Sequence, residues 1–159
     1  MIAREMTADD LDWVLTLNEQ HETELSPLDA PGLVDLGGSA FASLVSDPEA
    51  AFLISLSEVS DNTSPNFLWF RERYDQFVYV DRVCVSGEHR RKGLAGILYD
   101  SLFAEALMAG RTRICCEVNS DPPNPSSDAF HYTRGFEVVG ERHLEDRNKT
   151  VRYMVCELA

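Results

Sequence analysis

The stretch from Phe77 to Ala106 constrains the fold most, because a strand pattern, a basic loop and a helix pattern follow one another without a break. Residues 77–85 are rich in β-branched and aromatic side chains, which favours a strand. Apolar residues then recur about every four positions from Leu94 onwards, as in a helix buried along one face. Gly110 is the expected helix stop. The sequence therefore predicts a core built around a strand, a tight turn and a long helix.

The turn between this strand and helix, Arg90–Ala95, combines three consecutive cations with a glycine. The first N–H groups of a helix have no intrahelical partner, and the helix dipole is positive there. Glycine allows the backbone to approach a bound group closely. We expect this turn to bind an anion such as a phosphate. A solvated basic helix start is the alternative interpretation.

Length and hydropathy limit the class of protein. A chain of 159 residues can bury a core of its own, so we expect one domain spanning residues 1–159. No apolar run approaches the roughly 20 residues of a membrane span, and the N-terminus lacks an apolar signal core. These features predict a cytoplasmic protein without a membrane partner.

The four cysteines contain no CxxC spacing, so we expect reduced and mostly buried thiols. Cys115 and Cys116 are adjacent and should point to opposite faces of a strand. A cysteine nucleophile in a ping-pong mechanism is the less favoured alternative. The four histidines have no metal-ligand spacing, and no metal is expected.

The net charge of −13 lies almost entirely in the N-terminal part of the chain. Residues 1–70 contain one basic residue, Arg4, against 13 acidic ones, whereas residues 71–159 contain 13 basic and 14 acidic ones. Such an acidic chain is unlike a nucleic-acid-binding protein. The acidic excess serves solubility or, alternatively, attracts a cationic amine.

The remaining pattern predicts alternating strands and helices, which suits a mixed sheet flanked by helices. Phe67–Tyr74 is read as a core strand or as the wall of a pocket. The other expected elements are a strand at 2–5, a helix from Thr7 to Gln20, a helix at 32–46, and strands at 51–56 and 113–118; a helix at 126–133 and strands at 136–140 and 151–158 complete the set.

Two motifs resemble those of the GNAT superfamily of N-acetyltransferases. Arg90-x-x-Gly93-x-Ala95, preceded by Val80-x-x-Val83-x-Val85, resembles its acetyl-CoA motif. Residues 130–136 resemble its second signature, Phe-Tyr-x-x-x-Gly-Phe. The resemblance covers about residues 77–140; the first 70 residues match only in element order. It implies the α/β (α+β) GNAT fold, with a mixed, mostly antiparallel sheet of about six or seven strands and about four helices.

The resemblance implies acetyl-CoA as the acyl donor and CoA as the product. The pyrophosphate would lie on the basic turn and the pantetheine arm along the strand before it. Asn124 and Ser127 fall where the family has Asn-x-x-Ala, but a longer loop leaves Asn119 as the alternative asparagine. The cofactor-binding residues implied are Val83, Cys84, Val85, Arg90, Arg91, Lys92, Gly93, Leu94, Ala95, Asn119, Asn124, Ser127, Phe130 and His131.

Acetyl transfer to an amine needs a group that removes the amine proton, and it gains from a donor to the leaving thiolate. His131 stands where the family motif has its tyrosine and fits the thiolate side; a one-residue shift of the helix would bring in Tyr132 instead. His131 could also merely contact the cofactor. For the base, Asp81 is favoured because some relatives carry a glutamate there, and Glu117 is the second candidate. An ion pair with Arg82 or Arg73 is the structural alternative for Asp81.

The acceptor site is the least defined. The loop after the first helix offers Glu19, His21 and Glu22, and the aromatic run offers Trp69, Phe70 and Tyr74, with an exposed loop and core filling as the respective alternatives.

The resemblance favours direct transfer of acetyl to a primary amine, small molecules first, in a ternary complex. The alternatives are a CoA-binding sensor module without catalysis and an enzyme that modifies a protein N-terminus or lysine. The oligomeric state stays open, a homodimer being one option.

Overall fold

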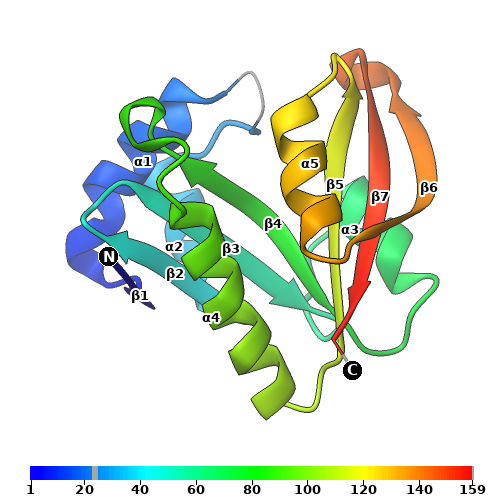
Figure 1. Ribbon diagram of the computed structural model, residues 1–159, viewed down its shortest axis with the longest axis horizontal. Coiled ribbons are helices and arrows are strands. Elements are labelled where there is room, and N and C mark those ends of the chain that lie inside the picture. Colours follow the sequence, from blue (N-terminus) through cyan, green and yellow to red (C-terminus); the bar gives the residue numbers. More distant parts are fainter. Residues whose placement is uncertain (23–24, 159) are drawn as a thin grey trace.

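The computed structural model describes residues 1–22 and 25–158, which form a seven-stranded sheet in the order β1-β2-β3-β4-β5-β7-β6 (Figure 1). Every neighbouring pair is antiparallel except β4 and β5, which are parallel. The expected mixed, mostly antiparallel sheet is therefore confirmed. The strands are β1 (Ile2–Glu5), β2 (Ala42–Asp47), β3 (Ala51–Ser57), β4 (Val78–Val85), β5 (Arg113–Asp121), β6 (Glu137–Leu144) and β7 (Lys149–Glu157).

Helices cover both faces of the sheet. α4 and α5 pack on one face, nearest the viewer in Figure 1, and α1, α2 and α3 pack on the other. None of the helices in the described ranges is both long enough and apolar enough to cross a membrane. The helices are α1 (Leu11–Gln20), α2 (Ala30–Gly38), α3 (Pro65–Arg71), α4 (Leu94–Met108) and α5 (Pro125–Thr133), with short 3₁₀ turns η1 (Ala8–Asp10), η2 (Gly87–His89) and η3 (Glu145–Arg147).

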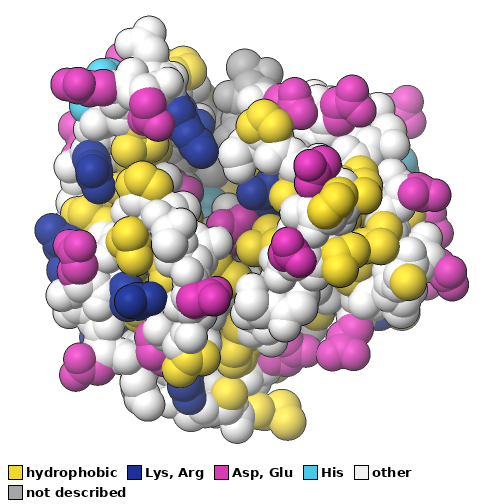
Figure 2. Space-filling model, turned by 180° about the vertical axis from the view of Figure 1, so that it is seen from behind, with side chains coloured by type: hydrophobic (Ala, Val, Ile, Leu, Met, Phe, Trp, Pro, Cys, Tyr) yellow, Lys and Arg dark blue, Asp and Glu magenta, His cyan; other side chains and the backbone are white. Residues whose placement is uncertain are grey.

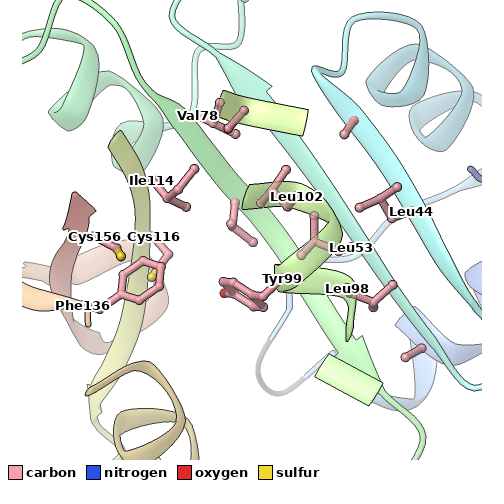
Figure 3. Packing of buried hydrophobic residues seen from close by; sticks show 14 of the residues in the cluster. Leu44, Leu53, Val78, Leu98, Tyr99, Leu102, Ile114, Cys116, Phe136 and Cys156 are labelled. Atoms are coloured by element: carbon pink, nitrogen blue, oxygen red, sulfur yellow. The ribbon is translucent and has the colours of Figure 1, made fainter. Parts of the chain in front are cut away.

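The predicted apolar stripe of α4 forms the centre of the core. Leu94, Leu98, Leu102 and Ala106 are all buried against the sheet, as their four-residue spacing requires. Figure 3 shows Leu98 and Leu102 in this packing. Gly110 follows the helix at φ +76°, a left-handed conformation in which glycine carries no steric cost. The central strand, turn and helix therefore form as the sequence predicts.

The predicted second helix is wrong over its second half. α2 ends at Gly38, after two glycines that favour helix termination, and residues 42–47 form β2. β2 pairs with β1 on one side and β3 on the other, so Leu44 and Val45 are fully enclosed. The sheet partners, which no local pattern reveals, decide the conformation of this segment.

The aromatic run is also wrong as a strand, because residues 65–71 form α3. Ser64 caps the helix: its Oγ accepts a hydrogen bond from the N–H of Phe67 at 3.4 Å, and Pro65 occupies the first helical position. Phe67 and Phe70, three positions apart, are buried in the core on the face of the sheet opposite α4 and α5. The Ser-Pro pair was the available signal for a helix start.

The cysteine prediction is confirmed. All four thiols are free and buried. Cys116 packs in the core beneath α4, whereas Cys115 packs among the aromatic residues on the opposite face.

Candidate active site

The site originates where two parallel strands part. β4 and β5 pair only at Val78 with Ile114 and at Tyr79 with Cys115. Beyond these residues β4 continues along β3 and β5 continues along β7, so a gap opens between them (Figure 1). The edges of both strands that face the gap have polar backbone groups available to a ligand.

A bulge sits in β4 where the gap opens. Ile54 pairs with Arg82 while its neighbour Ser55 pairs with Val80, so Asp81 is the extra residue. The bulge resets the alternation of side chains, and the valines before and after it pack on the α4 face. It also places Asp81 and Arg82 at the mouth of the gap.

The gap leads into a cavity of about 190 Å³ that reaches both faces of the sheet. Seen from behind, the molecule is hollowed here, with charged side chains inside the hollow (Figure 2). On the α4 and α5 side the lining includes Val80, Val83, Tyr99, Cys116, Val118, Asn124, Ser127 and His131. On the opposite side it includes Leu25, Ser26, Ser64, Pro65, Asn66, Tyr79, Glu117, Asn119, Leu144, Asp146, Arg147, Lys149 and Val151.

Glu117, on β5, is one of the three carboxylates among the described residues that line this cavity. The Tyr79 hydroxyl donates to its Oε2 at 2.7 Å, and Asn66 Nδ2 donates to its Oε1 at 3.1 Å. Asn66 is itself fixed by the Tyr153 hydroxyl at 2.8 Å. Burial raises the pKa of Glu117 to about 7, against the smaller opposing effect of the Tyr79 hydrogen bond. A carboxyl group with this pKa exchanges a proton readily near neutral pH.

Asp81, the first choice for a base, forms an ion pair instead. Its Oδ2 lies 2.9 Å from Nε of Arg82, and both side chains are nearly buried. Arg82 also donates to Oδ1 of Asn18 at 3.0 Å and to the carbonyl of Ser26 at 3.1 Å. The structural alternative therefore holds for Asp81, with Arg82 rather than Arg73 as its partner.

His131 lies at the α5 wall of the cavity and is only 4% exposed. Its Nδ1 is 2.7 Å from the carbonyl of Ser127, which can only accept, so the ring proton is assigned to Nδ1. The Tyr99 hydroxyl then donates to Nε2 at 2.8 Å. Burial lowers the pKa of His131, which keeps the imidazole neutral.

Tyr132 does not face the cavity. Its side chain is 48% exposed, and its hydroxyl accepts from Nη1 of Arg152 at 3.1 Å. The one-residue helix shift that would have made it the donor does not occur. Tyr99 of α4, which the sequence did not single out, lines the α5 side of the cavity instead; its ring packs in the core (Figure 3). A hydroxyl in an otherwise aliphatic stripe was the only signal for it.

The basic turn before α4 has the geometry of an anion site. Gly93 caps the helix at φ +80°, and Arg91 also has a positive φ of 65°. A Cβ added at Gly93 would meet no atom within 4 Å, so the backbone there borders open space. Nδ1 of His89, just before the turn, is buried without a hydrogen-bond partner among the described residues. These features fit a bound pyrophosphate.

The other expected cofactor residues divide between cavity and core. Asn119 and Asn124 both line the cavity, and Asn124 caps α5 by accepting from the N–H of Ser127 at 3.3 Å. Phe130 packs edge-on against Tyr99 with ring centres 5.2 Å apart. Val83 lines the cavity, whereas Val85, Cys84 and Leu94 pack in the core; Arg90, Arg91 and Lys92 are exposed, and Ala95 is partly buried.

The loop residues proposed for the acceptor, Glu19, His21 and Glu22, do not line the cavity. Glu19 and Glu22 are exposed, and His21 Nδ1 lies 2.9 Å from the carbonyl of Leu17 on its own helix. Leu25 and Ser26, a few residues further along, line the cavity instead.

The aromatic residues proposed for the acceptor also lie outside the cavity. Trp69 stacks on Tyr153 with centres 4.2 Å apart, and Tyr74 stacks on Phe70. α3 contributes the residues at its N-terminus, Ser64, Pro65 and Asn66. The aromatic run is therefore core, as its alternative interpretation held.

The comparisons agree with the fold and the motifs. The family model for the acetyltransferase (GNAT) family matches residues 38–136. The chain belongs to this family, which supports an acyltransferase activity; the family generally uses acetyl-CoA. No curated protein matches the chain.

Similar solved structures show the same fold at low identity. Ard1 from Thermoplasma volcanium has a TM-score of 0.78 and 16% identity, covering 99% of this chain and 97% of its own. Naa20 from Chaetomium thermophilum, in complex with a bisubstrate analogue, has a TM-score of 0.77 and 16% identity, with coverage of 99% and 87%. The ribosomal-protein-S18-alanine N-acetyltransferase from Escherichia coli has a TM-score of 0.70 and 16% identity, with coverage of 99% and 93%.

Substituting Gly93 by alanine tests the basic turn. The positive φ should cost about 1–2 kcal/mol of stability, and the new methyl group would occupy the space facing the ligand. We expect the Kd for acetyl-CoA, measured by titration calorimetry, to rise about tenfold or more. Gly110→Ala is the matched control, because Gly110 has a similar φ of +76° at the other end of α4. If Gly93→Ala and Gly110→Ala bound acetyl-CoA with equal Kd values, the turn would not be part of the cofactor site.

Proposed function

We propose that this protein is an acetyl-CoA-dependent N-acetyltransferase that transfers acetyl directly to the primary amine of a small molecule in a ternary complex. The observation that carries the proposal is Glu117, a carboxyl group with a pKa near 7, at the point where β4 and β5 part. The cavity reaches both faces of the sheet there, so donor and acceptor can enter from opposite sides. Holding both reactants together supplies much of the acceleration.

The donor binds on the α4 side. The turn at 90–95 holds the pyrophosphate, and the free edge of β4 around Val83 holds the pantetheine arm. Backbone N–H groups of β4 past the bulge at Asp81 are the donors available to the oxyanion that develops on the thioester carbonyl.

The acceptor binds on the Glu117 side. Its neutral amine attacks the carbonyl carbon; the new C–N bond forms, the C–S bond breaks, and CoA leaves as a thiolate. Glu117 takes the amine proton, directly or through one water, and returns it to solvent. Glu117 thereby takes the role of base for which Asp81 had been favoured, because Asp81 is held by Arg82.

The Tyr99 hydroxyl is the hydrogen-bond donor proposed for the thiolate. His131, at the position expected for a proton donor, has both ring nitrogens engaged and acts as a positioning residue for Tyr99. The phenol has one proton, so bonding to the thiolate replaces its bond to His131. This exchange occurs without a change in the charge of either side chain.

A protein N-terminus is the alternative acceptor. It is favoured by the similarity to a ribosomal-protein-S18-alanine N-acetyltransferase, although at 16% identity the similarity carries the fold alone. A sensor without catalysis is the weaker option, since a sensor has no need of a carboxyl group held at a pKa near 7 beside the gap.

Replacing Glu117 by glutamine tests the base. We expect kcat/KM of the wild type to rise with pH through about 7 as Glu117 loses its proton, and the variant to lose this rise with a drop in kcat of about 100-fold or more. Because burial raises the pKa of Glu117 in the folded protein from its ordinary 4.5 to about 7, the free energy of unfolding falls as pH rises from about 4.5 through 7. At pH 8 the free energy of unfolding of the variant should therefore exceed that of the wild type by about 3 kcal/mol.

Asp81→Asn is the companion variant for this test and should keep the rise near pH 7. If the rise of kcat/KM near pH 7 were intact in Glu117→Gln but lost in Asp81→Asn, the base would be Asp81 instead of Glu117. Thiol release from CoA measures both profiles.

Replacing Tyr99 by phenylalanine tests the thiolate donor. The ring packing remains, but His131 Nε2 loses its partner, which should cost about 1–3 kcal/mol of stability. We expect kcat to fall about tenfold or more, while the KM for acetyl-CoA stays within about twofold. Tyr74→Phe, which removes a hydroxyl outside the cavity, is the control. If the Tyr99 variant kept the full kcat of the wild type, Tyr99 and His131 would have a structural role only.

A further inference from the structure

Besides Arg82, which is paired with Asp81, two cations line the acceptor side of the cavity. Lys149 begins β7 and Arg147 ends η3, in the hairpin that joins β6 to β7. Lys149 and Val151 are two positions apart on β7 and therefore share a face of the sheet. Val151 pairs with Asn119, which in turn shares a face with Glu117. The lysine is thus on the same face of the sheet as the proposed base.

Within the described residues, neither cation forms an ion pair. The carboxylate of Asp81, which also lines the cavity, is taken by Arg82. Glu117, whose pKa burial raises to about 7, is only partly ionised at neutral pH; its charge raises the pKa of Lys149, but less than burial lowers it. Asp146 lines the cavity beside Arg147, and both side chains are exposed, so solvent screens their charges. Among the described residues, three cations and three carboxylates line the cavity. Because Asp81 is taken by Arg82 and Glu117 is ionised only in part near pH 7, the charges of Lys149 and Arg147 are not fully compensated.

Lys149 is partly buried, and burial lowers its pKa with a further contribution from Arg147. A partly buried cation without an anion is unfavourable, because it loses hydration without a compensating partner. The arrangement indicates that an anion comes from outside.

We propose that the acceptor is an amine that also carries an acidic group, which binds Lys149 and Arg147 while the amino group faces Glu117. This inference rests on the proposed function and specifies its substrate class. An amine with no acidic group would bring a second positive charge next to Lys149, whereas an amino acid or an amine with a phosphate or carboxylate compensates it. The anion also fixes the orientation of the molecule, so that its amine points into the gap.

Matched acceptors test the charge requirement. The first pair is 4-aminobutyrate and its amide, which differ in one negative charge. The second pair is a short peptide whose second residue is acidic and the same peptide with the side-chain amide of that residue in its place. We expect the acid of at least one pair to show a kcat/KM at least tenfold above its amide. A preference confined to the first pair identifies a small molecule, and one confined to the second identifies a peptide. Equal rates for acid and amide in both pairs would overturn the inference.

Variants then locate the anion. Lys149→Gln should raise the KM for the acid at least tenfold and leave the KM for the amide within twofold, whereas Lys149→Arg should restore much of the loss. Arg152→Gln is the control, because Arg152 lies on the same strand but pairs with Asp128 on the other side of the sheet. An unchanged KM in Lys149→Gln would overturn the assignment.

Binding separates this inference from the proposed function. If none of the amines is acetylated, titration of the CoA complex with 4-aminobutyrate, the acidic peptide and their amides still decides it. Preferential binding of an acid, lost in Lys149→Gln, would support the anion site while counting against catalysis. Equal or absent binding of acid and amide would overturn the anion site whatever the fate of the acetyltransferase assignment.

Discussion

The separation of β4 from β5 is the constraint on which the rest of the structure depends. A parallel pair that ends after Val78–Ile114 and Tyr79–Cys115 leaves backbone groups without ladder partners in the middle of a sheet. The structure tolerates this because each strand keeps a long antiparallel partner on its other side, β3 for β4 and β7 for β5. In the proposed mechanism, a thioester from one face meets an amine from the other in the opening that results.

The polar groups around this opening are arranged by burial and hydrogen bonding. Tyr79 and Asn66 hold Glu117 in place, and Tyr153 holds Asn66, so the carboxyl group is fixed although burial disfavours its charge. Arg82 joins the bulge of β4 to the loop at Ser26 and thereby ties the donor strand to the acceptor wall. Stability above neutral pH is lower as a consequence, which is the ordinary cost of a functional carboxyl group.

Sequence reasoning succeeded where local pattern and structure coincide. The four-residue apolar stripe of α4 and the glycine at its start could be predicted because periodicity and positive φ act locally. It failed for β2, whose conformation depends on two sheet partners, and for α3, whose aromatic residues pack equally well from a helix. Tyr99 and Lys149 could not be placed either, since their roles arise from elements that meet only in the folded sheet.

The most direct test of the central claim is a crystal structure of the protein with acetyl-CoA. We expect the pantetheine arm to follow β4 through the gap, with the thioester carbonyl between Val83 and Tyr99 and within one water of Glu117. A pyrophosphate on the turn at Gly93 should accompany it. Acetyl-CoA bound with its thioester outside the gap, or on the far side of α4, would contradict the role assigned to the parted strands.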